Sequence, residues 1–143
     1  MPHRSVRSII ANQSPLTAPP GMTVTEAAGL MQSSKVGALM VVENGRLAGI
    51  FTERDALYRV IAAGRDPQAT RVADVMTHEC QTIDPDKPLG HALHLMYEGG
   101  FRHVPVVENG TPLGMVSARD ALGPELEDFE SELVKREHIR EIL

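Results

Sequence analysis

Two stretches of the chain share one order of hydrophobic and polar positions. Each begins with apolar residues at helical spacing, which predicts one helix over residues 24–34 and another over residues 88–98. Two short apolar runs follow in each stretch, separated by Asn-Gly at positions 44–45 and 109–110. Because both residues of this pair tolerate positive φ, it favours a tight turn between antiparallel strands. The pattern therefore predicts a helix followed by a β-hairpin, twice.

The two stretches are copies of one unit at a spacing of 65 residues. Val-Val-Glu-Asn-Gly at 41–45 recurs at 106–110, and Arg-Asp-Ala-Leu at 54–57 recurs at 119–122. Two copies are too few for a solenoid, but a pair can bury one face of each unit against the other. We therefore expect an α/β (α+β) fold of two βαββα repeats, packed sheet to sheet about a pseudo-twofold axis.

This organisation divides the chain into four predicted segments. They are the first repeat (6–64), a polar connector (65–71), the second repeat (72–123) and a C-terminal amphipathic helix (124–143). The last helix is unrepeated, and its acidic start and more basic end complement the helix dipole. Its apolar stripe predicts that it packs on the module or across a dimer. That stripe consists of Leu126, Phe129, Leu133 and Val134.

The composition indicates one small globular module with an aliphatic core, because hydrophobic residues make up 42% of the 143 residues and aromatic residues 3%. The formal net charge of −5 argues against non-specific nucleic-acid binding, which requires many cationic side chains. It leaves room for a small anionic ligand in a locally basic cleft. The single cysteine, Cys80, favours a reducing cytoplasm, and no apolar run is long enough to cross a membrane. We expect Cys80 to be a small buried strand residue.

A seven-residue pattern, Gly-x-x-Thr/Ser-x-x-Asp, follows the turn of each hairpin at 49–55 and 114–120. Its hydroxyl stands where a helix begins, a place that suits a phosphate, and its carboxylate one turn later suits the hydroxyls of a ribose. The glycine lets backbone approach a ligand closely. The alternative is purely structural, with the hydroxyl as an N-cap and the carboxylate as a partner of the helix dipole.

This duplicated motif, together with the βαββα order, resembles the CBS domain family, whose paired form is called a Bateman module. The resemblance covers residues 6–122, and we expect a free-standing pair. It implies two clefts, each shared between the copies. One would use Ile50, Thr52 and Asp55 with Thr82, Phe101, Arg102 and His103. The other would use Met115, Ser117 and Asp120 with Thr17, Val36, Gly37 and Ala38.

The resemblance implies a non-enzymatic, cytoplasmic regulatory module. Its ligand would be AMP, ADP, ATP, NAD(H) or S-adenosylmethionine, and its partners a second copy of the chain and an unknown regulated protein. No catalytic set or Walker phosphate loop is present in the sequence. Since Arg102 and His103 can make charge-assisted hydrogen bonds, we expect the cleft that contains them to prefer phosphate-bearing ligands.

Two other functions remain open. In the first, the chain is a constitutive homodimeric scaffold whose vestigial clefts are filled by side chains such as Phe51, Phe101 and Met115. In the second, weaker alternative, His91 and His94 bind a metal ion. These two histidines lie on one helical face with Tyr97, and a solvated or dimer-facing surface explains them better.

Overall fold

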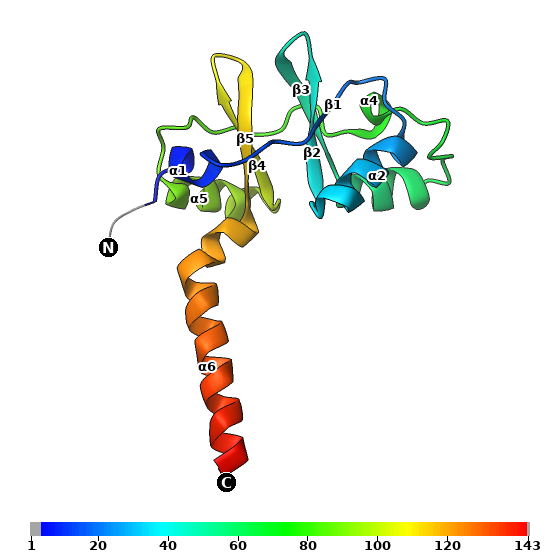
Figure 1. Ribbon diagram of the computed structural model, residues 1–143. Coiled ribbons are helices and arrows are strands. Elements are labelled where there is room, and N and C mark those ends of the chain that lie inside the picture. The colour runs from blue at the N-terminus through cyan, green and yellow to red at the C-terminus, as the bar shows by residue number, and fades with distance from the viewer. Residues whose placement is uncertain (1–3, 143) are drawn as a thin grey trace.

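The computed structural model describes residues 4–142, with the side chains of residues 4–121, 123 and 131–139. Two α/β halves lie side by side, and one long helix projects from the second half (Figure 1). The first repeat contains α1 (Val6–Ile10), β1 (Thr17–Ala18), α2 (Val24–Ser34), β2 (Ala38–Glu43), β3 (Arg46–Thr52), α3 (Glu53–Asp55) and the π-helix η1 (Ala56–Ile61). The second contains α4 (Val72–Val75), α5 (Leu89–Gly99), β4 (His103–Glu108), β5 (Thr111–Ser117) and the 3-10 helix η2 (Ala118–Leu122), followed by α6 (Gly123–Ile142).

The predicted helices and hairpins form, and the α/β repeat architecture is confirmed. Helix α2 begins at Thr23, whose Oγ1 accepts a hydrogen bond from Glu26 N at 3.2 Å, and α5 ends at Gly100 in the left-handed conformation. Both hairpin turns place their Asn-Gly pairs at positive φ. Strand β1 pairs with β2 in parallel, so the first sheet has three strands and the second has two.

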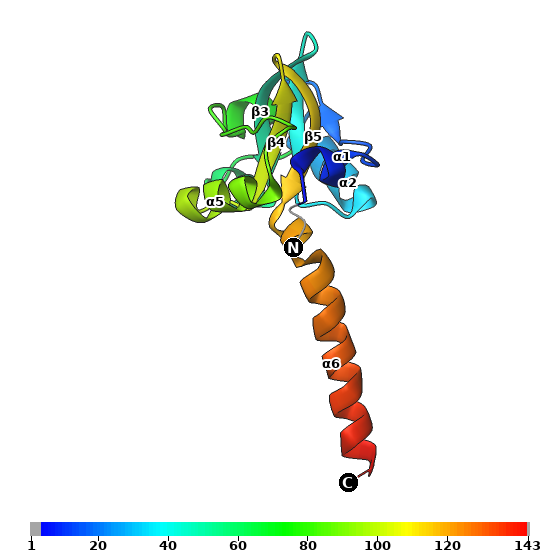
Figure 2. The ribbon, with the colours of Figure 1, turned by 90° about the vertical axis from the view of Figure 1, so that its left-hand side faces the viewer.

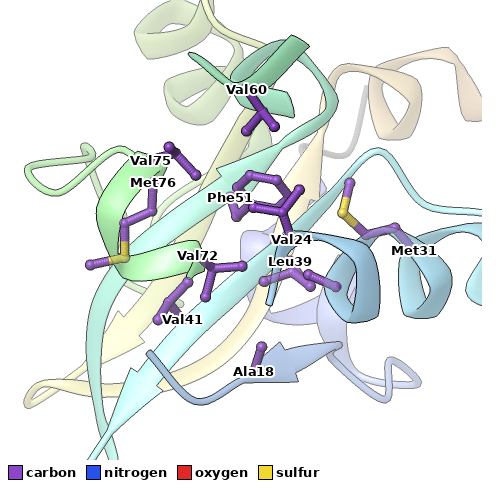
Figure 3. Packing of buried hydrophobic residues seen from close by; sticks show 11 residues of the cluster. Ala18, Val24, Met31, Leu39, Val41, Phe51, Val60, Val72, Val75 and Met76 are labelled. Atoms are coloured by element: carbon purple, nitrogen blue, oxygen red, sulfur yellow. The ribbon is translucent and has the colours of Figure 1, made fainter. Parts of the chain in front are cut away.

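The leading helix of each repeat packs on the other repeat. Val72 and Val75 of α4 lie in the first core beside Phe51 and Val41, as Figure 3 shows. In the same way, Val6 of α1 lies in the second hydrophobic core. The two copies that follow one another in sequence are therefore interleaved in space, and each half is completed by residues of the other.

Gly49 and Gly114, the glycines of the two motifs, allow the leading segment of the other repeat to pack closely against them. A Cβ atom on Gly49 would lie 2.7 Å from the carbonyl oxygen of Thr77, and one on Gly114 would lie 2.9 Å from the Ile10 side chain. Both distances are too short for a real Cβ contact. The expectation that these glycines make room for a ligand is therefore wrong for this structure, because they make room for the leading segment of the other repeat.

The segments after the motif differ between the repeats. In the first, one α-helical turn passes into the π-helix η1. In the second, η2 leads at Gly123 directly into α6. Pro124 is tolerated there because a proline in the first helical turn has no backbone N–H to satisfy.

Helix α6 points away from the two halves in both views (Figures 1 and 2). Leu133, Val134 and Ile139 on it are exposed. The expectation that α6 packs on its own module is therefore wrong, whereas packing across a dimer stays a prediction. The side chains of Leu126 and Phe129 lie outside the described residues. Over the described part of the chain, every helix is too short or too polar to traverse a lipid bilayer.

Candidate functional site

Two cavities open where the halves meet. We call them the Asp120 cavity, with a volume of about 480 Å³, and the Asp55 cavity, with a volume of about 530 Å³. Each receives its Thr/Ser-x-x-Asp motif from one repeat and the segment before β1 or α5 from the other. Both volumes lie in the range of small-molecule sites, which is roughly 300–1,000 Å³.

The Asp120 cavity brings together six of its seven predicted residues. They are Met115, Ser117, Asp120, Val36, Gly37 and Ala38. Thr17 does not line it. Thr17 opens strand β1, and the preceding residues 13–16 form the cavity wall instead.

The Asp55 cavity also brings together six of its seven predicted residues. They are Ile50, Thr52, Asp55, Phe101, Arg102 and His103. Thr82 does not line it, and Thr77 together with residues 79–81 takes its place. In both cavities the predicted threonine directly follows the segment that lines the cavity, because Thr17 comes after Leu16 and Thr82 after Gln81.

Asp55 is 6% exposed, and its carboxylate accepts several hydrogen bonds within the protein. Oδ2 lies 3.0 Å from Thr52 N and 3.1 Å from Thr52 Oγ1, while Thr77 Oγ1 lies 3.3 Å from Oδ1. Arg59 Nε lies 3.6 Å from Oδ1. This geometry matches the structural alternative for the motif, a helix cap that also ties α3 to the leading segment of the second repeat. The ribose role of Asp55 stays a prediction.

Asp120 is held by fewer groups. Its Oδ2 accepts from Ser117 N at 2.7 Å, with Ser117 Oγ at 3.4 Å, and the residue is only half-buried. Its carboxylate is therefore more accessible to a molecule in the cavity than that of Asp55.

The backbone at these helix starts is already partly engaged. Glu53 N donates to Gly37 O at 3.0 Å, and Ala118 N donates to Arg102 O at 2.9 Å. Asp55 N donates to Thr52 Oγ1 at 3.2 Å. These three N–H groups are therefore not free to hold a phosphate, and side-chain cations are the better candidates.

Three polar residues, Glu53, Arg102 and His103, line both cavities, and we call them the shared wall. The expectation that Arg102 and His103 belong to one cleft only is therefore wrong. Burial, with a smaller effect of the Arg102 charge, lowers the pKa of His103, although Glu53 and Asp120 act in the opposite direction. His103 is therefore neutral near pH 7, and Arg102 supplies the full positive charge of the wall.

Each cavity also has cations of its own. Lys35 and Arg119 line the Asp120 cavity, and Arg54 and Arg59 line the Asp55 cavity. Sequence reasoning missed Lys35, Arg59 and Glu53. The i, i+4 spacing of Asp55 and Arg59 on one helix could have revealed that pair.

The side chains expected to fill the clefts leave them open. Phe51 is fully buried in the first core and does not line either cavity, so its predicted place near the clefts is wrong. Phe101 and Met115 line the cavities without closing them. The position of Phe51 therefore does not support the hypothesis that the clefts are vestigial.

Cys80 lies outside any strand, is half-buried and lines the Asp55 cavity, so the expectation of a buried strand residue is wrong. Burial raises the pKa of its thiol, which disfavours the reactive thiolate. The helical histidines are exposed, as expected, and His94 Nε2 lies 3.0 Å from Glu98 Oε1. Among the described residues, no three His, Cys, Asp or Glu side chains gather in a way that could hold a metal ion.

Comparison with known proteins gives consistent matches. The sequence profile of the CBS domain matches residues 6–62 and 72–124. The CBS domain-containing protein CBSX3, mitochondrial, of Arabidopsis thaliana is 39% identical over 116 residues, which cover 78% of this chain and 56% of the relative. The chain thus spans little more than half of that protein.

Solved structures agree on the fold. A putative signal-transduction protein with CBS domains from Burkholderia ambifaria superposes with a TM-score of 0.80 at 31% identity, covering 87% of this chain and 95% of the other. A CBS domain protein from Pyrobaculum aerophilum, complexed with AMP, gives a TM-score of 0.72 at 24% identity and covers 82% and 88% of the two chains. At that identity, the second likeness concerns the fold alone.

Proposed function

The chain belongs to the CBS domain family, and from this premise we propose that its two cavities bind an adenine nucleotide or a related adenosyl ligand. The observation that carries the proposal is the pair of open cavities, each with a hydroxyl–carboxylate motif and with Arg102 in reach. The AMP complex of the P. aerophilum protein shows that a protein of this fold accommodates such a ligand.

The guanidinium of Arg102 favours ligands that carry phosphate. Arg102 lies in the wall of both cavities in a protein with a net charge of −5, and a guanidinium can bind a phosphate through two parallel hydrogen bonds. AMP, ADP, ATP, NAD(H) and S-adenosylmethionine all remain candidates, and we rank the phosphate-bearing ones first. The enclosed apolar surfaces of Ile50 and Phe101 or of Met115 and Ala38 would accommodate the base.

We propose that the module is regulatory and does not itself catalyse a reaction. Each cavity is built from both repeats, so a bound molecule contacts both halves at once. A ligand that binds one arrangement of the halves more tightly than another shifts the population toward that arrangement. A regulated partner would detect the shift.

A homodimer is the second part of the proposal. Leu57, Tyr58 and Ile61 on η1 and Tyr97 on α5 are between 51% and 88% exposed, which is unusual for large apolar side chains. A twofold partner could cover these helical faces. A constitutive homodimeric scaffold shares this property, and the internal use of the Asp55 carboxylate favours it as the rival function.

A thermal-shift panel separates the two functions. The full chain would be heated alone and with AMP, ATP, NAD(H), S-adenosylmethionine or adenosine, since a ligand that binds only the folded state raises Tm. We expect at least one phosphate-bearing adenine compound to raise Tm in a concentration-dependent way. No shift with any of them, together with a stable dimer by light scattering, would favour the scaffold.

A further inference from the structure

The shared wall breaks the pseudo-twofold symmetry of the module. At the spacing of 65 residues, the counterparts of Glu53, Arg102 and His103 are Ala118, Gly37 and Ala38. All three counterparts are small, so only one set of polar groups stands between the two cavities. An added Cβ on Gly37 would lie 3.0 Å from Glu53 Oε1, which shows that the small residue makes room for the carboxylate.

The cations that belong to the Asp55 cavity alone are already engaged by the protein. Arg59 Nη1 donates to Met76 O at 2.9 Å, and its Nε faces Asp55 at 3.6 Å. Arg54 Nη1 donates to Gly100 O at 3.2 Å. A phosphate in the Asp55 cavity would therefore depend strongly on Arg102.

The Asp120 cavity depends less on that residue, because Lys35 and Arg119 also line it. Arg102 nevertheless lines it too, on the side where the cavities adjoin. A guanidinium that holds one phosphate through both of its parallel N–H groups has fewer donors and less net charge left for a second phosphate.

We propose that phosphate groups in the two cavities compete for Arg102, so that a nucleotide in the Asp120 cavity weakens nucleotide binding in the Asp55 cavity. This inference rests on the proposed function. The effect is reciprocal, because a coupling free energy between two binding sites acts equally in both directions. It depends on phosphate, and adenosine would therefore fill the two cavities independently.

The test isolates each cavity by filling the other. Val36 is exposed at the Asp120 cavity and Gln81 is exposed at the Asp55 cavity, so Val36→Trp and Gln81→Trp each obstruct one cavity. Calorimetry with AMP and with adenosine then gives the affinity of each cavity alone. Two dissociation constants for AMP are compared: that of the second AMP on the wild type, and that of the single-cavity variant with the weaker affinity. We expect the first to be about fivefold or more higher than the second. For adenosine the two values should agree to within the factor of two that statistics alone produces for two independent sites.

The variant Arg102→Ala removes the shared guanidinium from both cavities and so tests its role in the competition. Native mass spectrometry of the full chain yields the ratio of the second to the first binding constant. In the wild type the AMP ratio should be lower than two independent cavities with the single-cavity affinities would give. In Arg102→Ala, with the single-cavity affinities measured in the same background, the measured and expected ratios should agree, as they should for adenosine in both proteins. Arg65→Ala, which removes an exposed arginine outside both cavities, should leave the ratio unchanged.

The outcomes distinguish the two proposals. If two AMP molecules bind with the affinities of the isolated cavities, the competition is overturned and the proposed function stands. The competition is also overturned if adenosine falls below its expected ratio as far as AMP does. If neither AMP nor adenosine binds the wild type, the adenine site itself is lost, and the competition is lost with it.

Discussion

The Asp55 and Asp120 cavities carry the same motif, but the protein uses its carboxylate differently in each. Asp55 is buried and joins Thr52, Thr77 and Arg59, whereas Asp120 is half-buried and is held by Ser117. Both line a cavity, but the carboxylate of Asp55 is mainly engaged within the protein and that of Asp120 is more exposed to the cavity. The duplicated motif therefore determines where each carboxylate lies, and contacts with the other repeat determine which groups that carboxylate binds.

The segments that precede β1 and α5 also differ between the two halves. In the Asp55 half, Ile50 exchanges backbone hydrogen bonds with Thr77, at 2.8 and 3.0 Å. At the equivalent place in the other half, the side-chain amide of Gln13 takes over: Nε2 donates to Met115 O at 2.8 Å, and Oε1 accepts from Met115 N at 3.0 Å. A side chain thus imitates a strand bridge in one half only.

We expect the largest difference in the free energy of unfolding between the variants that remove the carboxylates of Asp55 and Asp120. Asp55→Ala leaves Arg59 without its carboxylate partner and removes the acceptor for Thr52 and Thr77, so we expect a loss of about 3 kcal/mol in the free energy of unfolding. Asp120→Ala loses mainly the bond to Ser117, and we expect about 1 kcal/mol. Denaturant unfolding of both variants measures the difference. Equal losses would show that the carboxylates play equivalent structural roles.

Gln13→Ala should have the next largest effect. It leaves the N–H and C=O of the half-buried Met115 without their protein partners, at a cost of about 2 kcal/mol in unfolding free energy. Thr77→Ala, by comparison, keeps the backbone bridge and loses one hydroxyl bond, at about 1 kcal/mol. Should Thr77→Ala be the more damaging variant, the side-chain bridge at Gln13 would not hold its half together.

Cys80 reports on the Asp55 cavity alone. Because burial raises the pKa of its thiol, alkylation by iodoacetamide at pH 8 should be slower than alkylation of free cysteine. AMP should slow it further if it occupies the Asp55 cavity. Gln81→Trp, which obstructs that cavity, should remove the protection by AMP, whereas Val36→Trp should keep it. Protection that survives Gln81→Trp would place the ligand elsewhere.

The smallest expected effect concerns pH. Burial lowers the pKa of His103 in the folded state below its ordinary value of about 6.5, so the unfolded chain binds more protons between those two values. The contribution of His103 to stability is therefore complete above about pH 6.5 and is lost as the pH falls toward the folded pKa. Urea unfolding from pH 7.5 to 5 should show a weaker pH dependence in His103→Asn. An unchanged slope would mean that the pKa of His103 is the same in the folded and unfolded states.

The sequence predicts the repeat well because local signals determine it. Asn-Gly turns, the N-cap Thr23 and apolar spacing in α2 act within a few residues, and the structure forms α2 at the predicted bounds. Placement of the motif residues beside cavities also follows, since each motif spans the end of the second strand of its hairpin.

The sequence does not predict the relations between repeats. Three features depend on contacts between residues far apart in the chain. Helices α1 and α4 each pack on the other repeat, Arg102 lines both cavities, and Thr77 donates a hydrogen bond to Asp55. The sequence does not predict the orientation of α6 either. An apolar stripe indicates that one helix face packs against a partner, but it does not identify that partner. One sequence therefore suggests the site but not how the site is shared.

The central claim is that both cavities accept an adenine ligand and that Arg102 binds its phosphate. Isothermal titration of the wild type, Arg102→Ala and the control Arg65→Ala with AMP and adenosine tests it most directly. We expect Arg102→Ala to weaken AMP binding by roughly tenfold or more and to leave adenosine binding within about twofold of the wild type, because charge-assisted bonds contribute about 1.5–3 kcal/mol. Arg65→Ala should match the wild type. Equal losses for AMP and adenosine in Arg102→Ala, or no binding of either by the wild type, would contradict it.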